Sequence, residues 1–396
     1  MPSVHAVLSA SAAHRWMLCT PSARLEERLK GQLGESTSVF AEEGTKAHAL
    51  AELKLLRLKG SYGDRDGINE FNYNARREAL GEISREMEEA TDLYRDIIEE
   101  KYLTERGADE SAKLLVEQRL DLSPWIPEGF GTGDAIIISS AMLEVCDLKY
   151  GKGVPVSAEG NPQTRCYGLG AVHMFGRLWD FDTVRVTIIQ PRLDSVTEET
   201  LPRAELLDWG ANSLKPKAEL AWRGKGEYTP GEHCRFCAAK AVCSARVAKS
   251  MELFRFDAKP GLIPDESIPE LLRVVDIAED WIRDFRAYAL AQAIHGQEWR
   301  GYKLVRGRKP PRRWTDEERV REQLIRAGYT PDTFEDVKLK SASQVEKLIG
   351  KSAFGAMFSE LTVQEEGGLN LVPEADKRPG IAPADTVFAD IIDSNE

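Results

Sequence analysis

Helical and strand-like patterns of apolar residues alternate along the first three quarters of the chain. Apolar side chains three and four positions apart predict amphipathic helices, and short runs rich in Ile and Val predict buried strands. The predicted helices cover 42–55, 80–105, 163–179, 198–214 and 270–294, and a surface loop is predicted at 60–76. The predicted strands cover 114–120, 135–139, 143–147 and 183–190. This order predicts an α/β (mixed α+β) fold, in which helices flank a mixed central sheet and a mainly helical C-terminal extension follows.

The second and third predicted strands form a β-hairpin around a Ser-Ser-Ala-Met turn. If Ile138 pairs with Leu143, the antiparallel register sets Asp134 opposite Asp147, roughly 5 Å apart at Cβ. Residues two apart on a strand share a face, so Lys149 joins the same patch. Two carboxylates this close repel each other unless a cation lies between them. The hairpin therefore predicts a divalent metal site.

Residues outside the hairpin complete the predicted site. His48 falls in the first turn of its helix, which Thr45 caps, and the small residues around it favour a metal ligand over a packed histidine. Gln163 and Tyr167 lie four residues apart on one helix face, where they can hydrogen-bond a substrate phosphate or the attacking water. Glu144 faces the other side of its strand and is left out of the site.

Length and composition limit the classes of protein to which the chain can belong. A chain of 396 residues predicts two or three domains. With 42% hydrophobic and 30% charged residues, the composition is that of a soluble globular protein, and no apolar run approaches the ~20 residues that span a bilayer. The first residues lack the features of a secretory signal, so the expected compartment is the reducing cytoplasm, without membrane contact.

The net charge of -12 argues against non-specific coating of nucleic acid, because such binding is mostly phosphate neutralisation. One local run of positive charge contains no acidic residue, and it is either a DNA-contacting stripe or a solvated loop. The run consists of Arg300, Lys303, Arg306, Arg308, Lys309, Arg312 and Arg313.

Three of the six cysteines lie within ten residues, at Cys234, Cys237 and Cys243. This spacing in a cytoplasmic protein indicates metal binding rather than disulfides, and a tetrahedral metal or a cluster needs a fourth ligand. Cys19, at a break in the chain, is the best candidate, because Cys146 and Cys166 are predicted to be buried as small hydrophobic residues. Zinc and iron–sulfur both remain open, and His233 could replace a cysteine in a zinc site.

The order of these motifs is distinctive. It runs Cys19, Gly44-Thr45-x-x-His48, Gly131-x-Gly-Asp134, Asp147-Leu-Lys149, Gln163-x-x-x-Tyr167 and the three late cysteines. As a set they resemble the RecB-like branch of the PD-(D/E)XK nucleases, over about residues 5–246. One cysteine before the fold and three after it resemble the members with a 4Fe-4S cluster, such as AddAB-type nuclease subunits and CRISPR-adaptation exonucleases. The amino-acid sequence at Leu8–Cys19 and near Trp314 resembles that of a phage-encoded family of that branch with no assigned role.

The resemblance implies a role for each residue. The implied ligands of Mg²⁺ or Mn²⁺ are His48, Asp134, Asp147 and the backbone carbonyl of Leu148. The implied catalytic residues are Asp134, Asp147, Lys149, Gln163 and Tyr167. Lys149 would position or help deprotonate the attacking water, and Gln163 and Tyr167 would steady the substrate backbone. The implied ligands of a structural 4Fe-4S cluster, with zinc as the alternative, are Cys19, Cys234, Cys237 and Cys243.

The sequence thus predicts a metal-dependent DNA nuclease, an exonuclease acting on DNA ends or single strands during phage replication or recombination in a bacterial host. Its expected partners are DNA and phage proteins such as a single-strand-binding protein. A restriction-endonuclease-like domain is predicted at 1–246, a linker and long helix at 247–299, and an accessory region with a partly disordered acidic tail at 300–396. The alternatives are a non-catalytic nucleic-acid-binding scaffold and a zinc-stapled protein with an unrelated role.

Overall fold

The computed structural model describes residues 6–29, 39–252, 263, 265–302 and 325–326. The chain divides into two compact units, Met1–Val305 and Arg306–Glu396, and the sheet with its helices belongs to the first. The three predicted domains stay a prediction. Among the described residues, no helix is both long enough and apolar enough to cross a membrane.

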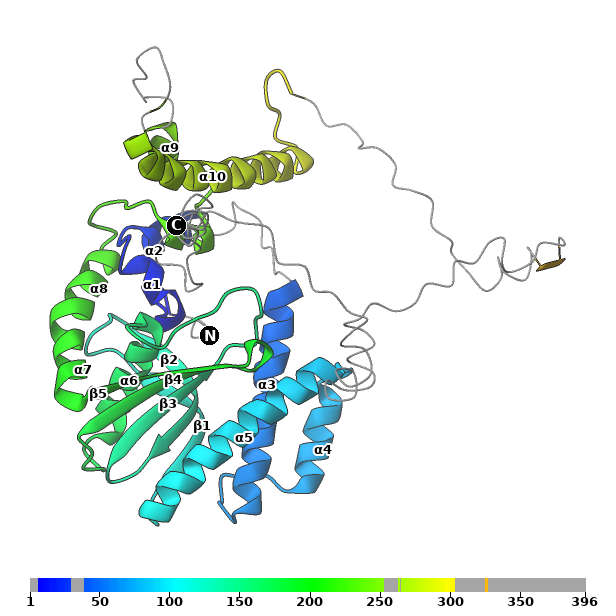
Figure 1. The fold of residues 1–396 in the computed structure, drawn as a ribbon, viewed down its shortest axis with the longest axis vertical. Helices are drawn as coiled ribbons and strands as arrows, with labels where there is room; N and C mark the ends of the chain where they lie inside the picture. The colour runs from blue at the N-terminus through cyan, green and yellow to red at the C-terminus, as the bar shows by residue number, and fades with distance from the viewer. Residues whose placement is uncertain (1–5, 30–38, 253–262, 264, 303–324, 327–396) are drawn as a thin grey trace, which may run out of the picture. The chain divides into compact units, whose positions relative to one another are not determined.

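A five-stranded mixed sheet forms the centre of the first unit (Figure 1). In spatial order its strands are β1 (Lys113–Asp121), β2 (Phe130–Ile138), β3 (Met142–Leu148), β4 (Thr183–Gln190) and β5 (Ser195–Pro202). Neighbouring strands are antiparallel except β3 and β4, which are parallel. Helix α6 (Pro162–Phe175) joins those two, because parallel neighbours require a crossover that returns the chain to the same end of the sheet.

Helices cover both faces of the sheet. Those before the sheet are η1 (Ala10–Ala12), α1 (Ala13–Trp16), α2 (Ser22–Leu29), α3 (Val39–Ser61), α4 (Glu70–Ala79) and α5 (Arg85–Ala108). Those after β5 are α7 (Arg203–Trp209), η3 (Gly210–Leu214), α8 (Lys215–Trp222), η4 (Glu232–Phe236), α9 (Ser244–Met251), η6 (Asp265–Ser267) and α10 (Ile268–Ile294), and η2 (Pro191–Leu193) links β4 to β5. Figure 1 shows α3 and α5 against one face and α6 and α7 against the other.

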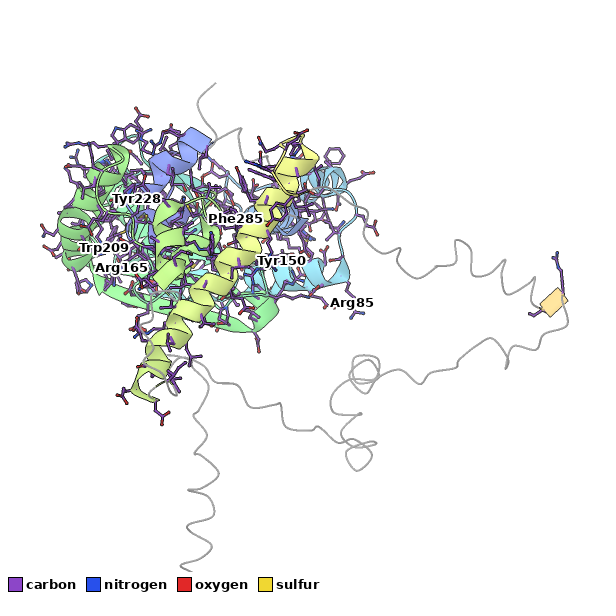
Figure 2. The ribbon with its side chains drawn as sticks, turned by 90° about the horizontal axis from the view of Figure 1, so that it is seen from above. Arg85, Tyr150, Arg165, Trp209, Tyr228 and Phe285 are labelled. Carbon is purple, nitrogen blue, oxygen red and sulfur yellow. The ribbon has the colours of Figure 1, made fainter. Side chains whose placement is uncertain are left out.

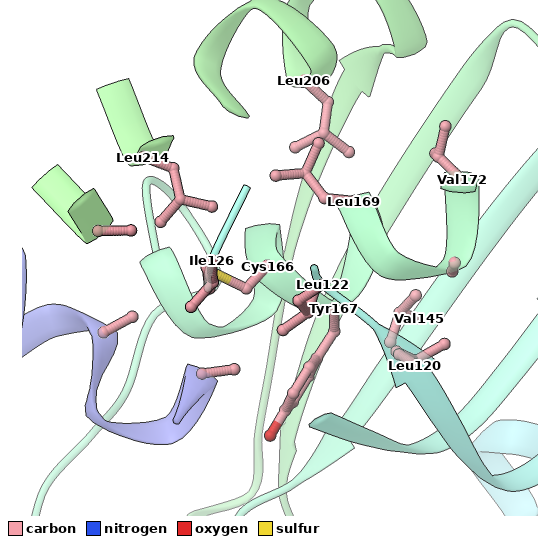
Figure 3. Packing of buried hydrophobic residues seen from close by; sticks show 14 of the residues in the cluster. Leu120, Leu122, Ile126, Val145, Cys166, Tyr167, Leu169, Val172, Leu206 and Leu214 are labelled. Atoms are coloured by element: carbon pink, nitrogen blue, oxygen red, sulfur yellow. The ribbon is translucent and has the colours of Figure 1, made fainter. Parts of the chain in front are cut away.

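Two apolar clusters fill the space between sheet and helices. Strand alternation sends Val145 toward α6 and α7, where it joins Leu169 and Leu206 (Figure 3). The next residue, Cys146, points the other way and packs with Tyr94 of α5. On the α6 side, Arg165 lies over the ring of Trp209, 5.6 Å from its centroid, and ties α6 to α7 (Figure 2).

The predicted mixed α/β architecture is confirmed, with helices flanking a mixed sheet and helices α9 and α10 after it. The hairpin and the strand at 183–190 lie where the sequence predicts them. Cys146 and Cys166 are fully buried, also as predicted.

Three predictions of detail are wrong. Residues 198–202 are not helical but belong to β5, whose alternating exposure is that of an edge strand with one covered face. Thr45 does not cap a helix, because α3 begins six residues earlier, at Val39, and His48 therefore lies in its interior. The predicted loop at 60–76 contains the start of α4, which Asn69 caps by accepting a hydrogen bond from the Asn72 amide.

Candidate active site

The hairpin brings its two aspartates together. In the register of β2 and β3, Ile138 pairs with Leu143 as predicted. One step beyond the last pair of the ladder, Ala135 with Cys146, Asp134 comes opposite Asp147. The amide of Leu148 donates a 2.7 Å hydrogen bond to Asp134 Oδ2, which fixes that carboxylate across the strand ends. The Leu148 carbonyl stays a predicted ligand.

Asp147 is the centre of a polar contact set at the end of β3. Lys149 Nζ lies 2.7 Å from Asp147 Oδ2 and donates to Gln163 Oε1 at 3.1 Å. The amide nitrogen of Gln163 donates in turn to Asp147 Oδ1 and to the Tyr167 hydroxyl, each at 3.1 Å. Asn161 caps α6 by accepting from the Gln163 amide, so the first helical turn aims Gln163 at the hairpin. Four of the predicted residues therefore form one connected group.

His48 reaches the site from α3. Its Nδ1 lies 3.3 Å from Asp134 Oδ1. Asp134 thus uses one oxygen toward His48 and the other toward the Leu148 amide. The structure brings together all the residues predicted for the metal site and its surroundings.

Glu117 is a site residue that sequence reasoning missed. It follows Val116, which pairs with Ala135, so the same register sets Glu117 opposite Asp134. Its φ is 49°, in the left-handed region that a non-glycine residue rarely adopts. Glu117, Asp134 and His48 each offer a ligand atom, and these atoms lie within 4.8 Å of one another. Among the described residues, this set has the spacing required to hold a single metal ion.

The charges of the site are only partly compensated. Burial raises the pKa of Asp147; the Lys149 ammonium opposes that rise and the Asp134 charge adds to it. Burial, with Asp134, raises the pKa of Glu117 to about 7. Burial lowers the pKa of His48, but its hydrogen bond to Asp134 and the charges of Asp134 and Asp147 together outweigh this effect and raise that pKa to about 8. Lys149 and, when it is protonated, His48 face the three carboxylates of Glu117, Asp134 and Asp147, and a metal ion that displaces the His48 proton would take over its role of compensating these charges.

The donors fit a hard divalent cation such as Mg²⁺ or Mn²⁺. Carboxylate oxygens and one imidazole are ligands that these ions accept. Asp147 Oδ2 is buried and, apart from its ion pair with Lys149, makes no hydrogen bond within the described part of the chain. The fully buried Tyr94 hydroxyl likewise has no hydrogen-bond partner there. Since buried polar atoms are rarely left unsatisfied, the Tyr94 hydroxyl, on which the charges of Asp134 and Asp147 act, indicates that the site accommodates a further polar group.

The exclusion of Glu144 is confirmed. It lies on the opposite face of β3, where it accepts hydrogen bonds from Lys101 at 2.7 Å and from Thr187 at 2.6 Å. These contacts neutralise the carboxylate within the α5 side of the sheet.

Gly131 opens the motif that ends at Asp134, and its lack of a side chain leaves room for Tyr167. A Cβ at this position would lie 2.7 Å from Tyr167 Cε1. We expect Gly131→Ala to displace the Tyr167 ring, to reduce stability by about 1–3 kcal/mol and to disturb its contact with Gln163. Thermal melting checks the stability. Gly153→Ala is the control, since its Cβ would meet nothing within 4 Å, and an equal loss in both variants would contradict the explanation.

The predicted cysteine ligands line one pocket. Cys19 comes from the segment between α1 and α2, and it faces Cys234, Cys237 and Cys243 from the region around η4 and α9. The same ends of the domain are also joined by Thr20, which donates to the Lys225 carbonyl at 2.6 Å.

The environment of the thiols suits metal binding. The Gly231 amide lies 3.4 Å from Cys234 Sγ and donates to it, and the backbone of Thr229 hydrogen-bonds to Cys19. Burial, with the charge of Glu26, raises the pKa of Cys237 to about 11, so this thiol needs a cation to ionise at neutral pH.

The spacing of the sulfurs bears on the choice of metal. A tetrahedral zinc with bonds of about 2.3 Å holds its sulfurs roughly 3.8 Å apart. Among the described side chains, no three of the cysteines bring their sulfurs within 4.8 Å of one another. His233 lines the same pocket, but its Nε2 lies 2.8 Å from the Thr229 carbonyl and is used there. The choice between zinc and a 4Fe-4S cluster therefore stays as open as the sequence left it.

The predicted basic run cannot be placed as a whole. Arg300 is described and exposed. The residues Lys303, Arg306, Arg308, Lys309, Arg312 and Arg313 lie outside the described residues, as do the predicted linker around Pro260 and the acidic tail after Glu360.

Comparison with known proteins shows the family of the chain. A family model described as "Protein of unknown function (DUF2800)" matches residues 5–379, and the chain belongs to this family. A solved structure titled "Crystal structure of SSO0001" is similar at 15% sequence identity, over 57% of this chain and 95% of that chain, with a TM-score of 0.21. A TM-score this low does not establish a shared fold.

Proposed function

We propose that the protein is a Mg²⁺- or Mn²⁺-dependent deoxyribonuclease, a PD-(D/E)XK enzyme of the RecB-like branch with an iron–sulfur cluster. It acts as an exonuclease on DNA ends or single strands. It functions in phage DNA replication or recombination in the cytoplasm of a bacterial host, with partners such as a single-strand-binding protein.

One observation carries the proposal. Asp134 and Asp147 stand opposite each other at the end of the hairpin, and Lys149 contacts Asp147 at 2.7 Å. Two acids and a lysine so placed can hold a divalent cation and a phosphate group together. A central mixed sheet flanked by helices is also what the resemblance to these nucleases implies.

Each residue of the site would have a separate role in phosphodiester hydrolysis. Asp134 and His48, with Glu117 at ligand spacing and Asp147 across the hairpin, would hold the ion, which when bound would polarise the scissile phosphate and make hydroxide available at neutral pH. Lys149 would place its ammonium beside the negative charge that develops on the phosphate. This attraction stabilises the transition state more strongly in a partly buried site than in water. Gln163 holds Asp147 and Tyr167 in fixed positions, which lowers the cost of reorganisation during the reaction.

The cysteine pocket supports a 4Fe-4S cluster as a structural element. Four cysteines line one pocket, and their order in the chain, one before the fold and three after it, resembles that of the nucleases with such a cluster. When bound, the cluster would connect the segment before α2 to the segment around η4. It contributes to folding rather than to the hydrolytic chemistry.

A non-catalytic scaffold with the same fold is the alternative function. The contacts of Lys149 argue against it, since a protein that only binds DNA has no need of an ammonium held between Asp147 and Gln163. A zinc-stapled protein with an unrelated role is the second alternative, and the visible absorption of the purified protein separates it from the first proposal.

Wild-type protein purified without oxygen should degrade linear DNA when Mn²⁺ is added, and EDTA should stop the reaction. The measurement uses end-labelled single- and double-stranded substrates, so that the size of the first products shows from which end digestion proceeds. Closed circular double-stranded DNA is the control for an exonuclease and should remain intact. Failure to cut any of these substrates with either ion would refute the proposed activity.

A further inference from the structure

We propose that helix α10 is the interface of a homodimer, in which two copies of the chain pair antiparallel along an exposed apolar face of this helix. The binding partner is therefore a second copy of the same chain. The inference does not depend on the proposed nuclease activity, because dimerisation can be measured without DNA and without a metal ion.

One face of α10 already packs against α9 and the segment before it, and Figure 1 shows the two helices side by side. The indole of Trp281 donates a hydrogen bond to the Ala241 carbonyl at 3.3 Å, and Asp284 accepts one from Arg246 at 2.6 Å. Val274 lies two turns before Trp281 on the same face and is buried. These contacts fix the orientation of α10 on the body of the first unit.

A second apolar face of α10 is exposed. Its large side chains each keep 40–55% of their surface exposed, and they are Ile268, Leu272, Val275, Ile282 and Leu290. Most of them follow one another at three- and four-residue steps, which is the spacing by which one helix packs along another. An exposed apolar face of this length indicates a contact with another protein surface.

Two charged residues interrupt this apolar face, and they are complementary to each other. Glu279 and Arg286 lie two turns apart on the same side of the helix. A two-fold axis midway between them places Glu279 of each copy alongside Arg286 of the other. The same axis places Val275 alongside Leu290, because both pairs share one midpoint. The face is therefore complementary to itself in both charge and hydrophobicity.

Charge also determines the direction of pairing. A parallel pair would set Glu279 against Glu279 and Arg286 against Arg286, and like charges facing each other across an interface weaken association. The antiparallel pair replaces both repulsions with attractions. This difference selects the antiparallel arrangement.

The size of the contact indicates a reversible dimer. A helix of 27 residues is about 40 Å long and about 10 Å wide, so the shared face measures about 400 Å² on each copy in projection. This area lies at the lower end of the range for specific interfaces. We therefore expect a dissociation constant on the order of 10 µM.

Sedimentation equilibrium of the full-length protein, over about 1–200 µM, tests the inference. The wild type should change from monomer to dimer over this range. Glu279→Arg and Arg286→Glu should each weaken the dimer by about tenfold or more, because each sets like charges against each other at both contacts. The variant with both changes should recover the wild-type dissociation constant. A mixture of the two single variants, one carrying a fluorescent label, should form heterodimers.

Arg273→Glu is the matched control. Arg273 lies on the polar side of the same helix, is exposed and pairs with Glu270, so its replacement should leave the dimer unchanged. A wild type that stays monomeric throughout the range would overturn the proposal and show that something other than a second copy covers the apolar face. A dimer that Glu279→Arg does not weaken would overturn the antiparallel pairing. A dimer that cuts no DNA would refute the nuclease activity alone.

Discussion

Lys149→Met and Asp147→Asn should each reduce the rate of DNA cleavage by about 10³-fold or more, because each removes a charge from the reacting centre. Met keeps the length of the lysine side chain, and Asn keeps the shape of the aspartate. Asp147 is buried and Lys149 is its ion-pair partner, so thermal melting is measured alongside to show that each variant is folded at the assay temperature. Initial rates on end-labelled linear DNA, at saturating Mn²⁺, measure the effect.

Lys152→Met is the matched control for the lysine variant. Lys152 lies three residues further along the same chain segment, is exposed, and pairs with Glu86 at 3.2 Å. Removing its charge should leave the cleavage rate within a factor of about two, since surface ion pairs contribute little. If Lys149→Met cuts DNA as fast as Lys152→Met, the assignment of the catalytic lysine is wrong.

The hairpin could be predicted because its determinants are local. A short turn and two apolar runs fix the register, and the register alone sets Asp134 opposite Asp147. The contact between Gln163 and Tyr167 follows in the same way from helical spacing, and their hydrogen bond bears it out. For these residues, sequence separation and periodicity were sufficient.

Other parts of the site depend on tertiary structure. Glu117 carries a signal, a carboxylate within the otherwise apolar start of β1, but regular alternation does not reveal a left-handed residue or its change of face. The mixed pattern at 198–202 does not distinguish a strand from the start of a helix, and only the pairing of β5 with β4 decides it. The contribution of Tyr94 depends on how α5 packs against the sheet, which no local pattern specifies.

Cys19→Ser should cause the largest loss of stability. Cys19 is the one predicted ligand from the beginning of the domain, and the other three lie more than two hundred residues later in the chain. Without it, a cluster could no longer join these segments, and its binding free energy would be lost to folding. A loss of about 4 kcal/mol lowers the melting temperature by roughly 10 °C in a domain of this size. The brown colour and broad visible absorption of the cluster should disappear in parallel.

Cys166→Ala separates the loss of a ligand from the loss of a buried thiol. Cys166 is fully buried within α6 and does not line the pocket, so its replacement should cost only about 1 kcal/mol and leave the visible spectrum unchanged. A Cys19→Ser protein that melts like the wild type would remove Cys19 from the ligand set. A colourless wild type with one equivalent of zinc would show that the four cysteines bind zinc in place of the cluster. The nuclease proposal would be unaffected, because the hydrolytic site at Asp134 and Asp147 uses none of these thiols.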